Sequence, residues 1–248
     1  MSNIVNVAWM YPDILNLHGE RGNAKAFELV SKKMGVKLNI DRIDDIDSNI
    51  NYENYDILLF NAGELKHIEK VKERLENDID KIKEYIKNNK IIFVTGTTGA
   101  LFAHNIDRLD GSSFNGLNLL DMDVKERNMV LGDDLCYKFE KMEIMSSQIQ
   151  MIDITLNKAK EFGKIIYGYG NNGRTEGARN KNLLFTNALG PVLVKNPWLT
   201  EYLINLALKN KGLKEINKKI DFDLELKSLE SAKEFINKKI ENEKNTKK

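Results

Sequence analysis

Cysteine is nearly absent from this chain of 248 residues, since Cys136 is the only one, and no disulfide can form within the chain. A single cysteine also gives no thiolate cluster for zinc. No run approaches the roughly 18 apolar residues of a membrane-spanning helix, and the stretch 1–10 is too short and too polar for a signal peptide. These absences predict a cytoplasmic protein without membrane insertion, bound metal or other cofactor.

A charge excess of one sign is lacking as well. The chain has 38 Lys and Arg against 37 Asp and Glu, a formal net charge of +1. Proteins that bind nucleic acid or membrane surfaces through bulk charge usually carry a clear basic excess, so neither partner is predicted. The hydrophobic share of 42% and the length of the chain allow one large core to be buried.

Apolar runs and helical patterns alternate through the first hundred residues. Strands are predicted over 4–10, 36–43, 56–60 and 90–94, with one helix from an N-cap at Asn23 and a longer one over 68–88. Continuous apolar strands are typical of a parallel sheet that is covered on both faces. The predicted fold is therefore α/β in three layers, with a central, mostly parallel sheet between helices.

The second half of the chain predicts an antiparallel extension over 117–154, strands over 162–167 and 183–186, and a helix that begins after Asn196 and ends at Gly212. From residue 214 the sequence is dense in Lys and Glu, which indicates one last amphipathic helix and then a disordered tail to residue 248. The predicted organisation is one domain over 1–212, followed by a charged helix and tail over 213–248.

Four glycine-containing segments follow one another in a distinctive order. They are YPDILNLHGERGN at 11–23, NAGE at 61–64, VTGTTG at 94–99, and YGYGNNG at 167–173 with EG at 176–177 and GPVLVKNP at 190–197. Together they resemble the glutaminase subunits of lipid II isoglutaminyl synthases, in the cobyric-acid-synthase-like (CobB/CobQ) branch of the class I glutamine amidotransferases. The resemblance covers roughly residues 4–212 and implies the three-layer fold of that family.

The resemblance implies a catalytic cysteine on the turn after a central strand and a histidine just before a Gly-Pro pair. At such a turn, backbone N–H groups and a helix N-terminus lower the thiol pKa and hold the oxyanion, and the histidine moves the proton. This sequence has Thr95 at the nucleophile position and Leu189 at the general-base position. No catalytic residue is therefore predicted.

No other residue replaces the missing pair by position. Cys136 lies in a stretch without a sharp turn and is interpreted as a buried structural cysteine. His18 lies in the opening loop, His67 starts the long helix, and His104 lies in the helix expected after the turn. The family's glutamine-pocket motif also has no match, because the corresponding region near 142–151 reads Ser146-Ser147-Gln148. What remains of the predicted substrate pocket is Gly63, Gly96 and Thr97.

The leading hypothesis is a catalytically degenerate subunit. The resemblance implies a heterodimer with a Mur-ligase-type amide synthetase, in the amidation of the cell-wall precursor lipid II. The alternative is an active amidotransferase or amidohydrolase that uses an unrecognised nucleophile on glutamine or another small amide. Thr95 would need a strong base beside it for that chemistry. The turn 95–99 is a weaker candidate for holding a small anion on its N–H groups.

The shape of the pocket distinguishes these hypotheses. A cavity beneath Thr95 that is lined by Gly63 and closed by Leu189 would favour the binding of a neutral ligand. A polar cavity with a pair of groups that activates water would favour an enzyme.

Overall fold

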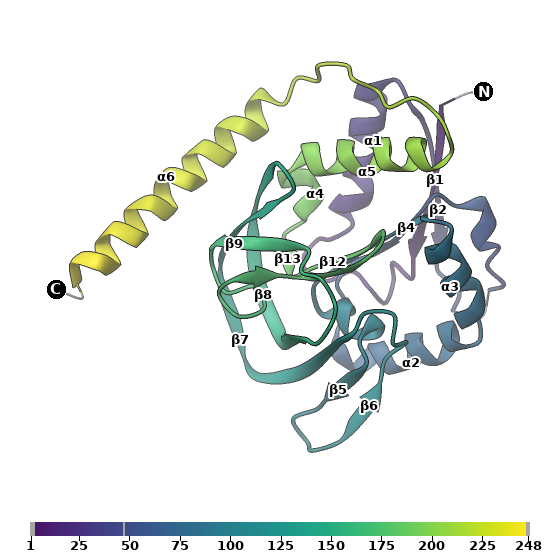
Figure 1. Cartoon of the computed structure of the whole chain (residues 1–248), viewed down its shortest axis with the longest axis horizontal. Helices are drawn as coiled ribbons and strands as arrows, with labels where there is room; N and C mark the ends of the chain where they lie inside the picture. The colour runs from purple at the N-terminus through teal and green to yellow at the C-terminus, as the bar shows by residue number, and fades with distance from the viewer. Residues whose placement is uncertain (1–2, 47, 247–248) are drawn as a thin grey trace.

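A computed structural model of the chain describes residues 3–46 and 48–246. At its centre is a six-stranded sheet in the order β11-β12-β4-β3-β1-β2 (Figure 1), parallel except for its edge strand β11. Its strands are β1 (Ile4–Met10), β2 (Lys37–Ile43), β3 (Ile57–Phe60), β4 (Ile91–Thr95), β11 (Ala178–Asn180) and β12 (Leu183–Thr186). The predicted strands therefore form, and they pair as a mostly parallel sheet.

Helices cover both faces of this sheet because alternate residues of each strand point to opposite sides. On β3, Ile57 and Leu59 belong to the apolar core under one set of helices, and Leu58 and Phe60 to the core under the other. The first set is α1 (Gly22–Met34), α4 (Val192–Lys195) and α5 (Pro197–Asn210); the second is α2 (Leu65–Glu76) and α3 (Ile79–Lys87) (Figure 1). The predicted three-layer α/β fold is confirmed.

The long helix predicted over 68–88 is wrong in one respect, because the chain forms two helices that are interrupted at Asn77 and Asp78. The apolar stripe continues across the interruption, so periodicity alone gave no sign of it. The Asp78 carboxylate accepts hydrogen bonds from Arg74 (2.8 Å), Lys81 (2.8 Å) and the hydroxyl of Tyr52 (3.2 Å). These tertiary contacts hold the bend that separates α2 from α3.

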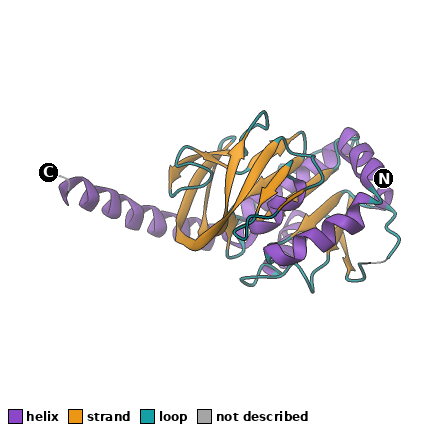
Figure 2. Cartoon of the chain, turned by 90° about the horizontal axis from the view of Figure 1, so that it is seen from below, coloured by secondary structure: helices purple, strands orange, loops and turns teal. Residues whose placement is uncertain are grey.

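The antiparallel extension forms a second sheet around a long hairpin (Figure 2). Two strands, β7 (Met122–Phe139) and β8 (Met142–Leu156), replace the several short pieces that the sequence indicated. The smaller strands are β5 (Asn105–Asp107), β6 (Ser113–Asn115), β9 (Gly163–Tyr167), β10 (Thr175–Glu176) and β13 (Ala188–Leu189); two short 3-10 helices are η1 (Tyr52–Asn54) and η2 (Gly96–Phe102).

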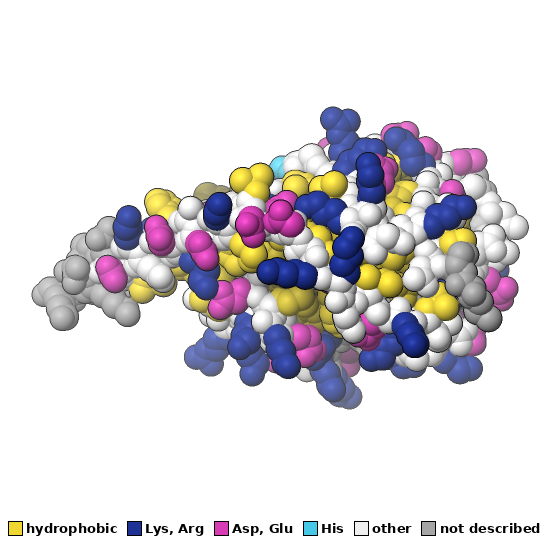
Figure 3. All heavy atoms as spheres, turned by 90° about the horizontal axis from the view of Figure 1, so that it is seen from above, with side chains coloured by type: hydrophobic (Ala, Val, Ile, Leu, Met, Phe, Trp, Pro, Cys, Tyr) yellow, Lys and Arg dark blue, Asp and Glu magenta, His cyan; other side chains and the backbone are white. Residues whose placement is uncertain are grey.

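The last helix, α6 (Asp223–Thr246), projects away from the body of the molecule (Figures 1 and 3). Its residues Leu229, Ala232 and Ile236 pack against Cys136 and Met145 of the long hairpin. The helix continues through the predicted tail as far as Thr246, and residues 247–248 lie outside the described part. The division into 1–212 and 213–248 stays a prediction.

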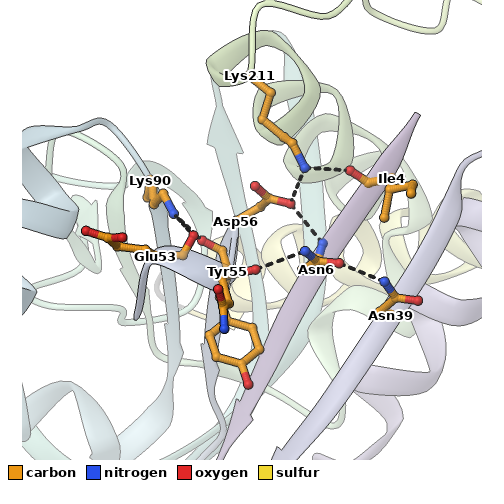
Figure 4. Close-up of polar contacts among 9 residues, drawn as sticks. Ile4, Asn6, Asn39, Glu53, Tyr55, Asp56, Lys90 and Lys211 are labelled. Carbon is orange, nitrogen blue, oxygen red and sulfur yellow. Dashed lines mark hydrogen bonds and ion pairs between the residues drawn. The ribbon is translucent and has the colours of Figure 1, made fainter. Parts of the chain in front are cut away.

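A polar cluster ties together the amino ends of the central strands (Figure 4). The Asp56 carboxylate accepts the backbone N–H of Asn6 (2.9 Å) and the amine of Lys211 (2.9 Å), which also donates to the carbonyl of Ile4 (2.8 Å). The Lys90 amine donates to the carbonyls of Glu53 (2.7 Å) and Tyr55 (2.8 Å). This edge of the sheet is closed by direct contacts, and the candidate site lies at the opposite, carboxyl edge.

No helix within residues 3–46 and 48–246 combines the length and the apolar character that crossing a membrane requires.

Candidate functional site

Thr95 is the last residue of β4, and the chain turns sharply after it. Gly96 follows with φ +59°, a left-handed conformation that side chains other than glycine rarely adopt. The turn leads into the 3-10 helix η2 instead of a full α-helix, so His104 lies beyond that helix and not within one as predicted. Thr95 is fully buried, and its hydroxyl donates to Oε2 of Glu20 at 3.0 Å.

Glu20 is a fully buried carboxyl group from the loop between β1 and α1. Besides Thr95, it accepts hydrogen bonds from the Asn23 side chain (2.7 Å) and from the backbone N–H of Gly190 (2.8 Å). Burial raises the pKa of Glu20 above its ordinary range, and these hydrogen bonds pull it partly back. One side chain thus links the opening loop, the turn after β4 and the Gly-Pro segment.

Asn23 does not cap α1 as the sequence predicted. The helix begins at Gly22, and the Asn23 side chain is buried inside the site. It donates to Glu20 and to Oδ1 of Asn61 (3.1 Å), and it accepts the N–H of Leu193 at 2.9 Å. Its role is tertiary: it joins the start of α1 to the turn after β3 and to α4.

Leu189 lies on β13 with 1% of its surface exposed and packs directly over Gly96. A Cβ atom placed on Gly96 would lie 2.8 Å from Leu189 Cδ2 and 2.9 Å from the Ala62 methyl group. At Gly63, the corresponding Cβ position lies 2.4 Å from Leu15 Cδ2. The space beside both glycines of the predicted pocket is therefore occupied by the protein's own apolar side chains.

The turns after β3 and β4 are joined through Thr98. Its hydroxyl donates to the carbonyl of Asn61 (2.7 Å) and accepts the N–H of Gly63 (2.9 Å), while Thr97 is 7% exposed. Gly63, Gly96 and Thr97 are thus brought together on these two turns, as the sequence predicted, but in a buried setting. Nδ2 of Asn61 is buried there without a partner among the described residues.

A second buried carboxyl group lies beside the first. Glu176 is fully buried and accepts the hydroxyl of Thr186 (2.7 Å) and both the backbone and side-chain N–H groups of Asn187 (2.6 and 3.1 Å). Thr186 ends β12 and pairs in register with Thr95 at the end of β4. Burial raises the pKa of Glu176 as well.

The segment 146–148, which has lost the family motif, closes the site from the side of β8. The Ser146 hydroxyl donates to the carbonyl of Leu189, and the Ser147 hydroxyl accepts the Lys195 amine at 3.0 Å. Oε1 of Gln148 accepts the N–H groups of Tyr169 (3.2 Å) and Gly170 (3.0 Å). These residues hold the Leu189 and Gly168–Gly170 segments in place, a role that does not require the lost motif.

Cys136 does not contribute to this site. It lies in the middle of β7 beneath α6 with 1% of its surface exposed, and burial raises its pKa to about 11. A thiol with such a pKa is a poor nucleophile, which agrees with a structural role. Within the described part of the chain, no three His, Cys, Asp or Glu side chains gather as a metal site requires.

Two curated relatives align with most of the chain. Both are the GatD subunit of lipid II isoglutaminyl synthase (glutamine-hydrolyzing). The protein of Staphylococcus aureus is 26% identical over 218 residues, covering 87% of this chain and 89% of the relative. That of Streptococcus pneumoniae is 26% identical over 216 residues, with 84% and 82% covered. A scan against protein-family models matches none.

Solved structures share the architecture. A crystal structure of a glutamine amidotransferase superposes with a TM-score of 0.53 at 13% identity, covering 83% of this chain and 99% of that one. The chain has a class I glutamine amidotransferase-like fold. A ThuA-like protein of Bacteroides uniformis superposes equally well, with a TM-score of 0.53 at 9% identity and 88% and 96% covered. The fold alone therefore does not decide the activity.

Sequence reasoning missed the two buried carboxyl groups of this amidotransferase-like chain. Glu20 lies within the opening segment, but a glutamate next to an arginine in a polar loop is usually exposed. Glu176 is followed by a glycine and reads in the same way. The only available signal was that both lie in segments that carry the family resemblance, and their burial depends on residues up to 170 positions away.

Proposed function

We propose that this chain is a glutamine amidotransferase-like subunit that does not hydrolyse glutamine and that supports a Mur-ligase-type synthetase in the amidation of lipid II. Two relatives named as the GatD subunit of a glutamine-hydrolyzing lipid II isoglutaminyl synthase support the pathway and the subunit role. The observation that carries the loss of activity is the Thr95 position: its hydroxyl is fully buried, donates to Glu20, and lies beside a turn covered by Leu189.

The chemistry explains why this arrangement does not suit glutamine. Attack on an amide needs a nucleophile that is exposed to the substrate and a group that carries its proton to the departing ammonia. The apolar Leu189 side chain carries no proton, and with Ala62 it fills the space next to Gly96 where a substrate carbonyl would approach. A Mur-ligase-type partner would activate a carboxylate with ATP and use ammonia, for which this subunit would serve as a structural support or a gate.

One observation favours the alternative of an active amidohydrolase. Glu20 accepts the Thr95 hydroxyl proton at 3.0 Å, and a carboxylate with a raised pKa is a suitable general base. In such a mechanism Glu20 would take the Thr95 proton while Oγ1 attacks the amide carbon, and the proton would leave with ammonia. This pair would need Leu189 to move away from Gly96 before a substrate could reach Thr95.

Ammonia release from L-glutamine tests the proposal, measured for the chain alone and with its cognate synthetase subunit. We expect no release above background from the native chain in either case. The double variant Thr95→Cys, Leu189→His should regain some release, whereas Thr95→Cys with Leu189 retained is the matched control and should regain less. Release by the native chain that disappears in Thr95→Val would contradict the proposal and support the threonine mechanism.

The partner is tested separately by sedimentation of the two purified subunits together. A stable one-to-one complex is expected, and its amidation of lipid II with free ammonium as nitrogen source should exceed that of the synthetase alone. If the chain neither associates with the synthetase nor changes its activity, the subunit role is wrong even if glutaminase activity is absent.

A further inference from the structure

A basic cleft of about 660 Å³ lies on the second face of the chain, away from Thr95. It is formed by the connection between β8 and β9 and by the tight turn between β11 and β12. We define the basic cleft by the residues Asp121, Lys158, Lys160, Arg179 and Lys181, with Ala159 and Asn180 between them. A cavity of this volume suits a small molecule or a headgroup.

The walls of the basic cleft are fixed by backbone hydrogen bonds. The N–H of Arg179 donates to the carbonyl of Lys160 at 2.7 Å, which bridges the two segments. The carbonyl of Asp121 accepts the N–H groups of Asn157 and Ala159, both at 3.1 Å, and the Asn180 side chain donates to Leu119 at 3.0 Å. The cations are therefore presented from a preorganised frame, which reduces the entropic cost of binding.

The charges of the basic cleft are not balanced. Arg179 pairs with Glu140 at 3.1 Å outside the lining, and Lys181 donates to a backbone carbonyl. Within residues 3–46 and 48–246, Lys158 and Lys160 have no ion-pair or hydrogen-bond partner. Counting Glu140, four cations meet two carboxylates, a local surplus of two positive charges in a chain whose net charge is +1.

We propose that the basic cleft binds a phosphate group that carries two negative charges. Lysine ammonium groups are compact point charges that bind phosphate oxygens, and an arginine adds a planar donor pair. A doubly charged phosphate matches the surplus of the cleft, whereas a single carboxylate would leave one charge uncompensated. The phosphate is either that of a free metabolite or that of an anionic lipid headgroup.

The basic cleft is separate from the Thr95 site, so the inference goes beyond the proposed function. Asn180 and Lys181 lie just before β12 begins, while Thr186 at the other end of the same strand reaches the buried carboxyl groups. An occupant of the basic cleft therefore binds at the amino end of the strand, and it needs neither glutamine nor an open pocket at Thr95.

Titration calorimetry of the full chain with pyrophosphate is the first measurement, at low salt and again with about 150 mM salt, where exposed charges are screened. We expect saturable binding with one site per chain. The variant Lys158→Gln, Lys160→Gln should weaken binding at least about tenfold, because two charge-assisted contacts are lost. The matched control is Lys70→Gln, Lys83→Gln, which removes the same charge from exposed positions on α2 and α3 and should change affinity less than about twofold.

Vesicle binding distinguishes the two sources of phosphate. Vesicles of phosphatidylcholine with phosphatidylglycerol are compared with pure phosphatidylcholine, using the same four proteins' worth of variants and free pyrophosphate as competitor. Binding of free pyrophosphate alone identifies a soluble ligand, and binding of the anionic vesicles, lost in Lys158→Gln, Lys160→Gln, identifies a headgroup. Absence of both, or equal weakening in the cleft variant and in its control, would overturn the proposal.

Discussion

The two buried carboxyl groups, Glu20 and Glu176, solve the same local problem over very different sequence distances. Each accepts the hydroxyl of a threonine that ends a central strand, and those threonines, Thr95 and Thr186, are neighbours in register. Glu176 binds residues 10 and 11 positions away, whereas Glu20 binds Thr95 75 positions away and Gly190 170 positions away. Glu176 therefore shapes one local turn, and Glu20 assembles the edge of the sheet.

The difference also concerns the nearby charges. The Lys195 amine exerts an attraction that lowers the pKa of Glu20, but burial is the larger influence and the net effect is a rise. Around Glu176, only hydrogen bonds from Thr186, Asn187 and Gly177 oppose burial. The comparison suggests that buried carboxyl groups, and not the missing cysteine and histidine, hold the architecture of this edge.

Removing either carboxyl group should give the largest effect. Glu20→Ala and Glu176→Ala each leave two or three buried donors without a partner, and each such donor costs about 1–3 kcal/mol. We expect each variant to lower the free energy of unfolding by about 3 kcal/mol in urea denaturation.

Hydrogen exchange then separates the two groups. Glu20→Ala should accelerate exchange of the Gly190 and Leu193 amides, far from position 20 in the sequence, while Glu176→Ala should affect mainly Asn187 and Ala188. If both variants changed exchange over the same segments, the distinction between long-range and local roles would be wrong.

The pH dependence of stability is the next test. Burial raises the pKa of both groups above their ordinary value of 4.5, so the folded protein retains protons that the unfolded chain has released. The stability that these groups contribute is therefore lost as the pH rises above about 4.5 and through the raised folded-state values. Denaturation of the native chain and of Glu20→Gln and Glu176→Gln across pH 5–8 checks this sign.

In that series, the difference in unfolding free energy between the native chain and each Gln variant should shrink as the pH rises. A shift of one pKa unit corresponds to about 1.4 kcal/mol, which sets the scale. A difference that stays constant over pH 5–8 would mean that burial does not raise the pKa of the group in question.

Asp56 at the opposite edge of the sheet provides the smallest effect. Its carboxylate pairs with Lys211 at 2.9 Å, and the Lys211 side chain is 34% exposed (Figure 4). Such pairs contribute at most about 1 kcal/mol. Asp56→Asn keeps an acceptor for the Asn6 N–H and should lower the unfolding free energy by about 1 kcal/mol or less. A loss as large as that of Glu20→Ala would remove the contrast between the two edges.

Periodicity and strand patterns were sufficient to predict the three layers of this chain. The apolar runs that end at Met10, Phe60 and Thr186 became strands within one residue of their predicted limits. The bend between α2 and α3 escaped prediction because an apolar stripe continues across it, and the contacts that hold it come from Tyr52 and from neighbouring charges. Asn23 and Asn196 were interpreted as helix caps, yet both side chains bind distant backbone groups.

The site divides in the same way. The sequence by itself determined that Thr95 and Leu189 stand where the family resemblance expects a cysteine and a histidine, since the identity of a residue at a motif position needs no structure. Only the tertiary structure decided that Leu189 lies over Gly96, that Glu20 holds Thr95, and that four cations surround one cleft. These arrangements depend on contacts between segments far apart in the chain, and a local pattern carries no information about the burial that such contacts create.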